Sequence, residues 1–227
     1  MEMLLDVPSV LKVRHPAKYT DALMPVFVRM LRGSKRILDP FGGVGGIFKI
    51  QPWLPDTEIQ AVEIEKEYAD MHPRTTHGNA LSLPWPDDYF DAVATSPTYS
   101  NRMADSHNAK DGSRRNTYTH AIGHKLHPDN SGAMQWGPKY REFHAKAWVE
   151  ARRALCVGGI FILNIKDHIR KGEVMQVTRW HKEALQYIGF RLIEENQIET
   201  PGNRQGANGD ARLPYESVIL FQLESKR

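Results

Sequence analysis

The segment from residue 160 to residue 165 reads Ile-Phe-Ile-Leu-Asn-Ile, an apolar run without alternation of polar and apolar residues. A strand of this kind is covered on both of its faces, as in parallel sheets that are packed between two layers of helices. The segment therefore predicts a buried sheet with helices on both sides.

Segments with strand and helix patterns alternate along the rest of the chain. Predicted strands cover 36–39, 59–63, 75–78, 90–95, 160–165, 191–200 and 217–223, and predicted helices run from the turn after 36–39 to Pro52 and over 65–71, 140–155 and 174–187. The stretch Val157-Gly-Gly159 and Gly189 are expected to end the last two helices. The alternation predicts an α/β fold with a doubly wound, mostly parallel seven-stranded sheet. No helix pattern separates the last two strands, so the final strand is expected to be antiparallel.

The length and composition favour one globular domain over residues 1–227. Hydrophobic residues make up 41% and charged residues 25% of the 227 residues, which is ordinary for a soluble protein. The single cysteine, Cys156, excludes a disulfide framework and a thiolate zinc site, and we expect it to pack at the end of a helix. We recognise no signal peptide and no membrane span, which leads us to expect a cytoplasmic protein. The net charge of +3 permits an anionic partner.

A polar insertion from Tyr99 to Pro138 interrupts the alternation. It is rich in Asn, His, Ser and Gly and has no clear periodicity. Structureless segments of this length inside a domain are usually functional or disordered. The insertion also leaves from the carboxyl end of a predicted strand, where doubly wound sheets bind ligands. We therefore predict a substrate-binding or DNA-binding loop that is mobile in the free protein.

A glycine-rich turn, Pro40-Phe-Gly-Gly-Val-Gly-Gly46, follows the first predicted strand. Glycines let the backbone approach a ligand closely and turn sharply into a helix, although a tight structural turn has the same requirements. Glu63 closes the second strand, where a carboxylate can accept hydrogen bonds from both hydroxyls of a ribose. Asn79 follows the third strand and offers a donor and an acceptor, which suit the edge of an adenine. These residues predict a nucleoside-binding edge.

Four stretches in this order resemble the amino-methyltransferases, which use S-adenosylmethionine to methylate exocyclic amines of DNA bases. They are Asp39–Gly45, Val62–Glu65, Gly78–Ala80 and Ser96–Tyr99, and His15-Pro-Ala-Lys-Tyr19 is similar to a further element of the family. The resemblance implies the Rossmann-like class I methyltransferase fold, S-adenosyl-L-methionine as cofactor and DNA as partner. A cognate restriction enzyme or specificity subunit is a further partner that it implies. The cofactor-binding residues implied are His15, Lys18, Tyr19, Asp39, Phe41, Gly43, Gly45, Glu63, Ile64, Asn79 and Ala80.

The stretch Ser96-Pro97-Thr98-Tyr99 carries the expected chemistry. An aromatic amine is a poor nucleophile because its lone pair is delocalised into the ring. Hydrogen bonds from its two N–H groups to Ser96 Oγ and to the Pro97 carbonyl free that lone pair, and Tyr99 is expected to stack on a base flipped out of the helix. Alignment and electrostatics then supply most of the rate, without a metal or a covalent intermediate. In the family, the serine form of this motif leans toward cytosine N4 and the aspartate and asparagine forms lean toward adenine N6.

Two positions depart from the family pattern. Asn79 stands where the family usually has an aspartate. Thr98 stands where it has a second proline, and the change removes the rigidity that the fixed φ of proline gives. A catalytically weak nucleic-acid-binding subunit that keeps the fold is therefore an alternative to an enzyme. Methylation of RNA or of a protein glutamine is another.

Polar loops are expected to contact the DNA, because no segment is large enough for a separate recognition domain. The predicted contacts in the insertion and in the loop 201–214 are Asn101, Arg102, Arg114, Arg115, Lys125 and Arg204. For each of the basic residues, the alternative interpretation is a solvated surface charge that contacts no DNA. The spacing of His120, His124 and His127 would allow one helical face, but structural zinc sites usually need thiolates as well, so we predict no metal site. Methylation at cytosine C5 needs a cysteine nucleophile beside the base, which the position of Cys156 does not favour.

Overall fold

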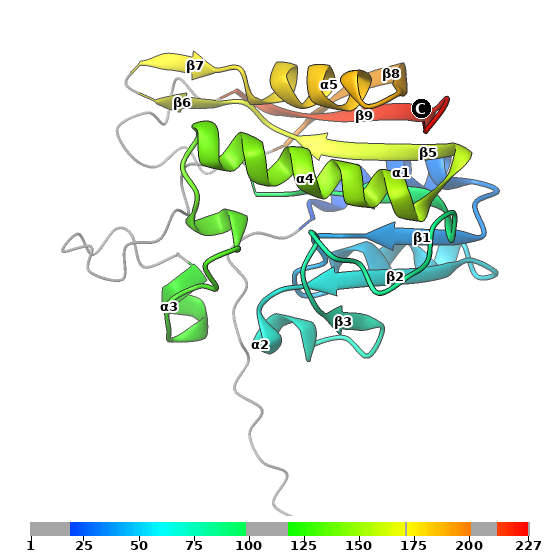
Figure 1. Ribbon diagram of the computed structural model, residues 1–227, viewed down its shortest axis with the longest axis horizontal. Coiled ribbons are helices and arrows are strands. Elements are labelled where there is room, and N and C mark those ends of the chain that lie inside the picture. The colour runs from blue at the N-terminus through cyan, green and yellow to red at the C-terminus, as the bar shows by residue number, and fades with distance from the viewer. Residues whose placement is uncertain (1–18, 99–117, 171, 201–212, 227) are drawn as a thin grey trace, which may run out of the picture.

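The computed structural model describes residues 19–98, 118–170, 172–200 and 213–226 of the chain. Its main strands are β1 (Arg36–Asp39), β2 (Glu58–Glu63), β3 (Thr75–His77), β4 (Phe90–Thr95), β5 (Leu155–Ile165), β8 (Phe190–Glu199) and β9 (Tyr215–Leu223). They form a seven-stranded sheet in the order β3-β2-β1-β4-β5-β9-β8 (Figure 1). Strands β1 to β5 pair in parallel, and β9 is antiparallel to both of its neighbours. The predicted sheet and its antiparallel last strand are confirmed.

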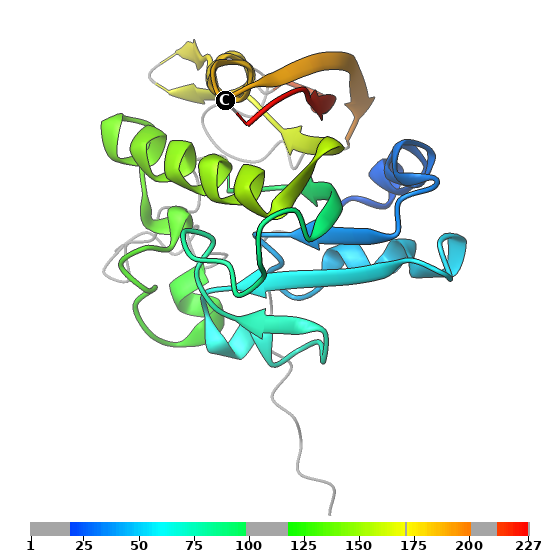
Figure 2. The same ribbon diagram turned by 45° about the vertical axis from the view of Figure 1, so that its right-hand side comes forward.

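Helices cover both faces of this sheet. They are η1 (Asp21–Leu23), α1 (Met24–Leu31), η2 (Gly46–Trp53), α2 (Lys66–Ala69), α3 (Tyr118–Ile122), η4 (Ser131–Ala133), α4 (Pro138–Ala154) and α5 (Val177–Tyr187). One buried cluster joins α4 and α5 to one face of the sheet, and a second joins η1, α1 and η2 to the other (Figure 2). In β5, Phe161 and Leu163 belong to the first cluster and Ile162 to the second. The prediction that this strand is covered on both faces is confirmed.

The junction of α4 and β5 differs from the prediction. α4 ends at Ala154 and β5 begins at the next residue, so no glycine caps the helix. Gly158 has a φ of 82°, and a Cβ on Gly159 would lie 2.9 Å from the Asp91 carbonyl oxygen. The pairing of β4 with β5 shifts register beside this point. These glycines therefore allow an irregularity in β5, where the absence of a Cβ on Gly159 lets the backbones of β4 and β5 come close together.

Cys156 also lies elsewhere than predicted. It is the second residue of β5, not a helix end, and its Sγ lies 2.8 Å from the Asp88 carbonyl oxygen. The amino end of β5 is the sheet edge opposite to the carboxyl ends of the parallel strands. The cysteine is therefore far along the strand from any ligand bound at those carboxyl ends.

Part of the polar insertion has regular structure, contrary to the prediction. α3 and η4 lie within it, and Glu65 holds the segment against the turn after β2. The buried Glu65 carboxylate accepts hydrogen bonds from the His127 N–H (2.8 Å) and from Asn130 Nδ2 (2.7 Å). These partners are more than sixty residues from Glu65 in the chain, so local periodicity carries no signal for them. Residues 99–117 lie outside the described part of the chain.

Smaller differences affect other elements. α1 lies in a stretch for which no element is predicted. The strands β6 (His168–Arg170) and β7 (Glu173–Met175) form a hairpin, and β7 occupies the start of the helix predicted over 174–187. The segment after the glycine-rich turn is a 3-10 helix, and α2 has only four residues. Within the described ranges, every helix is too short or too polar to cross a lipid bilayer.

Candidate functional site

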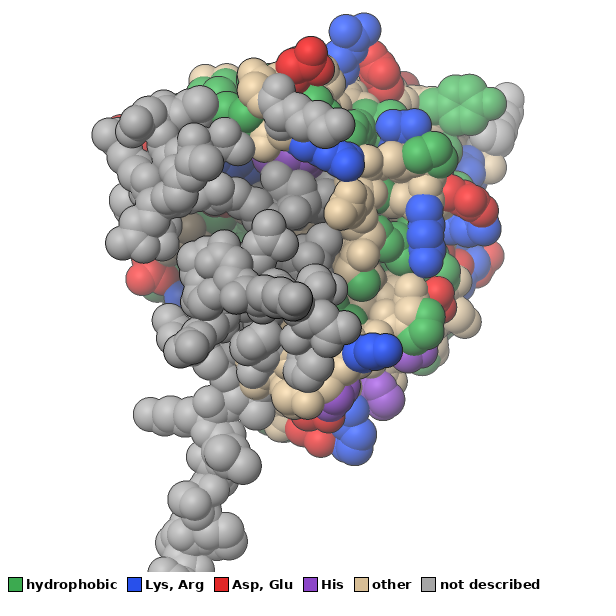
Figure 3. All heavy atoms as spheres, turned by 90° about the vertical axis from the view of Figure 1, so that its left-hand side faces the viewer, with side chains coloured by type: hydrophobic (Ala, Val, Ile, Leu, Met, Phe, Trp, Pro, Cys, Tyr) green, Lys and Arg blue, Asp and Glu red, His purple; other side chains and the backbone are tan. Residues whose placement is uncertain are grey.

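The carboxyl ends of five parallel strands place four predicted residues and Asn164, which was not predicted, along one edge of the sheet. In sheet order, Asn79 follows β3, Glu63 ends β2, Asp39 ends β1, Ser96 follows β4 and Asn164 lies near the end of β5. The winding of the chain reverses between β1 and β4, and open α/β sheets bind ligands at such a point. Figure 3 views the molecule from this edge, where histidine and charged side chains gather at the rim on the side of α2 and β3.

The glycine-rich turn after β1 needs glycine for two separate reasons. Gly45 has a φ of 81°, which lies in the left-handed region where glycine is favoured. Gly42 packs so closely on β2 that a Cβ would lie 2.7 Å from Ala61 Cβ. Its N–H donates to the Val62 carbonyl at 2.8 Å. The turn is therefore pressed against β2, which brings its N–H groups beside Glu63.

Glu63 holds the glycine-rich turn in place through its carboxylate. Oε2 accepts a hydrogen bond from the Gly43 N–H at 2.9 Å, and Oε1 accepts one from the Glu65 N–H at 2.8 Å. Removal from water raises the pKa of this half-buried carboxyl to about 7, although the backbone hydrogen bonds act in the opposite direction. Glu63 thus lies where the sequence places it, with its ionisation balanced near neutral pH.

Asp39 forms a buried junction beneath the turn. Its carboxylate accepts hydrogen bonds from Thr95 Oγ1 (2.7 Å), the Phe41 N–H (3.0 Å) and the Tyr19 hydroxyl (2.8 Å). Burial raises its pKa to about 6, against the effect of these three donors. Asp39 has no exposed surface. Its hydrogen bonds with Thr95 and Tyr19 connect β1 to β4 and to the segment before η1.

The other predicted cofactor-binding residues that the structure describes lie at or after the ends of β1, β2 and β3, or at Tyr19. The Phe41 ring packs against His144 and Trp148 of α4, with ring centroids 5.5 and 5.7 Å away. The Ile64 carbonyl lies 3.1 Å from His77 Nε2, and Ala80 is buried in the core. Tyr19 and Gly45 lie at the turn itself, whereas His15 and Lys18 fall outside the described residues.

Asn79 has a carboxylate as its partner. Its Oδ1 accepts a hydrogen bond from the Leu81 N–H at 2.9 Å, and its Nδ2 donates to Asp129 Oδ2 at 3.1 Å. Position 79 lacks the aspartate of the family pattern, but the insertion places the carboxylate of Asp129 directly beside it. Asp129 is fifty residues away in the chain, and its position was not predicted.

Ser96 is oriented by Asn164, a residue that the sequence reasoning missed. Asn164 Nδ2 donates to Ser96 Oγ at 3.0 Å and to Glu216 Oε2 of β9 at 2.8 Å. Asn164 is 1% exposed, so its amide is fixed within the sheet. A lone asparagine near the end of the apolar run 160–165 was the signal that could have indicated it. Tyr99, the predicted stacking residue, lies outside the described residues.

Thr98 is held by both its side chain and its backbone. Its Oγ1 lies 2.7 Å from Ser131 Oγ, and its carbonyl accepts a hydrogen bond from the Tyr140 hydroxyl at 2.8 Å. Tyr140 Oη lies 3.1 Å from His181 Nε2, and Trp148 Nε1 donates to His181 Nδ1 at 3.0 Å. None of these partners was predicted, because they come from elements distant in the sequence.

Among the predicted DNA contacts, only Lys125 lies in the described part of the chain, where it is exposed. The others, Asn101, Arg102, Arg114, Arg115 and Arg204, fall outside it. His124, which precedes Lys125, has its Nε2 2.8 Å from Glu67 Oε1. The pKa of His124 is raised by its hydrogen bond with the Lys125 carbonyl and by the Glu67 carboxylate. Within the described ranges, no three His, Cys, Asp or Glu side chains form a group that could hold a metal ion.

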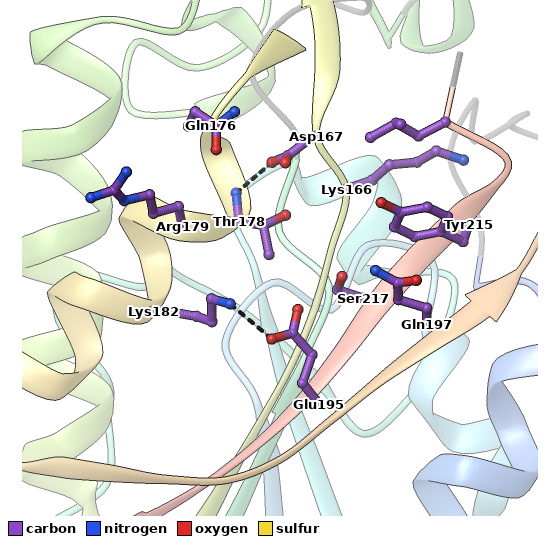
Figure 4. Close-up of a pocket in the computed structure, with 11 residues that line it drawn as sticks. Lys166, Asp167, Gln176, Thr178, Arg179, Lys182, Glu195, Gln197, Tyr215 and Ser217 are labelled. Carbon is purple, nitrogen blue, oxygen red and sulfur yellow. Dashed lines mark hydrogen bonds and ion pairs between the residues drawn. The ribbon is translucent and has the colours of Figure 1, made fainter.

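A polar hollow of about 150 Å³ lies apart from the glycine-rich turn, between α5 and the ends of β5, β8 and β9 (Figure 4). Lys182 there forms an ion pair with Glu195 at 2.8 Å, and Asp167 accepts from the Thr178 N–H at 2.7 Å. None of the predicted site residues that the structure describes lines this hollow. It is therefore not the site that the strand ends form.

Comparisons with known proteins point to the fold. No family model and no curated protein matches the sequence. Among solved structures, geranyl diphosphate C-methyltransferase from Streptomyces coelicolor A3(2) is similar, with 12% identity and a TM-score of 0.57 over 89% of this chain and 78% of that one. The PH0226 protein from Pyrococcus horikoshii OT3 has 14% identity and a TM-score of 0.55 over 89% and 88%. The 1,6-didemethyltoxoflavin-N1-methyltransferase from Burkholderia thailandensis has 11% identity and a TM-score of 0.52 over 90% and 79%.

The chain has the class I methyltransferase fold. Two of these structures were solved with S-adenosylhomocysteine bound. Identities of this size establish the shared architecture alone, and the chemistry has to be argued from the residues at the strand ends.

Proposed function

We propose that this protein transfers a methyl group from S-adenosylmethionine to an exocyclic amino group of a DNA base, with cytosine N4 favoured over adenine N6. The observation that carries the proposal is the position of Ser96. It follows β4, one strand from the glycine-rich turn after β1, and Asn164 orients its hydroxyl. A cofactor at the turn and an amine at Ser96 would therefore be neighbours.

The residues of the turn fit the nucleoside part of this cofactor. Gly42 lies so close to β2 that no side chain fits there, and the backbone of the turn would approach the cofactor. The Glu63 carboxylate beside it is suited to accept hydrogen bonds from two ribose hydroxyls. Asp129, fixed by Asn79, would accept a hydrogen bond from the adenine amino group. When bound there, S-adenosylmethionine supplies an electrophilic methyl group.

Ser96 would prepare the target amine for attack. Asn164 Nδ2 donates a hydrogen bond to Ser96 Oγ and so orients the hydroxyl. In the proposed complex, Ser96 Oγ would accept a hydrogen bond from one N–H of the amine. The Pro97 carbonyl would accept the second N–H. Pro97 also restricts Ser96 to extended conformations, which keeps the two acceptors side by side. Withdrawing both N–H groups from the ring plane exposes the nitrogen lone pair.

DNA is the substrate class that the two polar loops favour. Exposed Lys125 lies in the insertion, where it would approach a backbone phosphate. The compared enzymes are named for small molecules, geranyl diphosphate and 1,6-didemethyltoxoflavin. We propose instead a single-domain enzyme that reads DNA with its loops or with a cognate specificity partner.

The test is transfer of labelled methyl groups from S-adenosylmethionine to duplex DNA, RNA and a protein mixture, each supplied separately. Hydrolysis of labelled DNA to nucleosides is expected to release N4-methylcytosine. Ser96→Ala should abolish the label, and the exposed Ser82→Ala serves as the matched control. Label in RNA or in protein glutamine, with none in DNA, would show that the substrate assignment is wrong.

A further inference from the structure

A buried chain of hydrogen bonds runs from α4 to α5, back to α4 and on to the segment after β4. Trp148 Nε1 donates to His181 Nδ1 at 3.0 Å, His181 Nε2 lies 3.1 Å from Tyr140 Oη, and Tyr140 Oη donates to the Thr98 carbonyl at 2.8 Å. The three side chains have no exposed surface. Because unpaired polar groups are costly in such a place, a chain of this kind tends to have one fixed arrangement.

The direction of each hydrogen bond is set by the two ends of the chain. The indole of Trp148 can only donate, so His181 Nδ1 must accept. His181 is therefore neutral with its proton on Nε2, which donates to the Tyr140 oxygen. The Tyr140 proton then has the Thr98 carbonyl as its acceptor. Burial of His181 lowers its pKa, in agreement with a neutral ring.

Thr98 has a second anchor in the insertion. Its hydroxyl lies 2.7 Å from the hydroxyl of Ser131, which is 4% exposed. A proline at position 98 would fix its own φ but would have no hydroxyl for this contact. The threonine therefore replaces local rigidity by one tertiary hydrogen bond through its side chain. The second bond, from Tyr140, goes to the backbone carbonyl, which a proline would also have.

Resting on the function proposed above, we propose that Tyr140 is a positioning residue for methyl transfer. Its hydroxyl, oriented by His181, fixes the Thr98 carbonyl and thereby the spacing of Ser96 Oγ and the Pro97 carbonyl. Tyr140 acts through Thr98 and would not touch the amine itself. Small errors in the placement of reacting groups cost much of the rate. The loss of Tyr140 Oη should therefore lower kcat, while the affinities for cofactor and DNA remain.

The first test compares Tyr140→Phe with Tyr89→Phe. The first variant keeps the ring and removes only the hydroxyl, and the second removes a hydroxyl that contacts exposed Glu58 at the opposite edge of the sheet. We expect kcat of Tyr140→Phe to fall about tenfold, with the KM for DNA and the Kd for S-adenosylhomocysteine within about twofold of the wild type. Tyr89→Phe should match the wild type in all three. A kcat for Tyr140→Phe equal to that of the wild type, while Ser96→Ala is inactive, overturns the positioning role and leaves the proposed function intact.

Two further measurements do not depend on activity. Long-range proton–nitrogen NMR of the wild type should find the His181 proton on Nε2, and a proton on Nδ1 would contradict the chain. Amide hydrogen exchange should be faster over residues 94–98 in Tyr140→Phe than in the wild type, and equal exchange would overturn the proposal. If the wild type labels no substrate, the proposed function fails, and these two measurements still decide whether Tyr140 holds the strand end.

Discussion

The ionisation of Glu63 leads to a quantitative prediction for cofactor binding. Its carboxyl accepts two backbone hydrogen bonds, and burial raises its pKa to about 7. The carboxylate can accept a ribose hydroxyl at each of its two oxygens, whereas protonation turns one of these oxygens into an O–H donor. A raised pKa means that this form is lost as the pH falls through about 7. Cofactor affinity should therefore decrease on acidification.

The size of the effect follows from the fraction of ionised Glu63. For the pKa of about 7, roughly nine tenths of the carboxyl is ionised near pH 8 and roughly one tenth near pH 6. The apparent Kd scales with the inverse of the competent fraction, so it should be about tenfold higher near pH 6. Asp39, whose burial raises its pKa to about 6, could add to the dependence.

Isothermal titration of S-adenosylhomocysteine between these pH values measures the effect. Adenosine is a second ligand, because it has no amino-acid group that titrates in this range. In Glu63→Gln, the affinity near pH 8 should fall by about tenfold or more and lose most of its pH dependence. The control is Glu58→Gln, an exposed residue at the opposite edge of the sheet. A wild-type Kd that is equal at both pH values, or an unchanged pH dependence in Glu63→Gln, would show that the ionisation of Glu63 does not control cofactor binding.

Three other substitutions test neighbouring parts of the site. Asp129→Ala should weaken adenosine binding about five- to tenfold, because the adenine amino group loses an acceptor; an unchanged Kd would exclude Asp129 from the site. Gly42→Ala should lower the free energy of unfolding by about 1–3 kcal/mol in urea titrations, because a Cβ would meet Ala61 Cβ at 2.7 Å, whereas Gly78→Ala should cost less. Asn164→Ala should lower kcat, with cofactor affinity retained, and equal kcat would show that Ser96 does not need this orientation.

Local patterns in the sequence predicted much of the scaffold of the site. The strand 90–95 has the predicted bounds, and Asp39, Glu63 and Ser96 lie at the predicted edge of the sheet. The prediction of these elements was correct because apolar runs and glycine turns are properties of neighbouring residues. The positions of the three side chains were correct because parallel strands bring their carboxyl ends to one edge of the sheet. Phe41 shows the limit, because its packing on α4 has no counterpart in the motif itself.

Hydrogen-bond partners across the fold could not be predicted in the same way. Thr98 is 33 residues from Ser131 and 42 from Tyr140, and the pairing of Asn79 with Asp129 spans fifty residues. Such contacts depend on how α4 and the insertion pack against the strand ends. The consequence of replacing a proline by Thr98 therefore became visible only in three dimensions.

Single-turnover transfer of a labelled methyl group to duplex DNA, at saturating S-adenosylmethionine, measures directly whether the protein methylates DNA through Ser96. We expect N4-methylcytosine from the wild type and a rate at least about a hundredfold lower from Ser96→Ala, whose Kd for S-adenosylhomocysteine should be unchanged. Equal rates in the two proteins, or a label found in RNA or protein but not in DNA, would contradict this expectation.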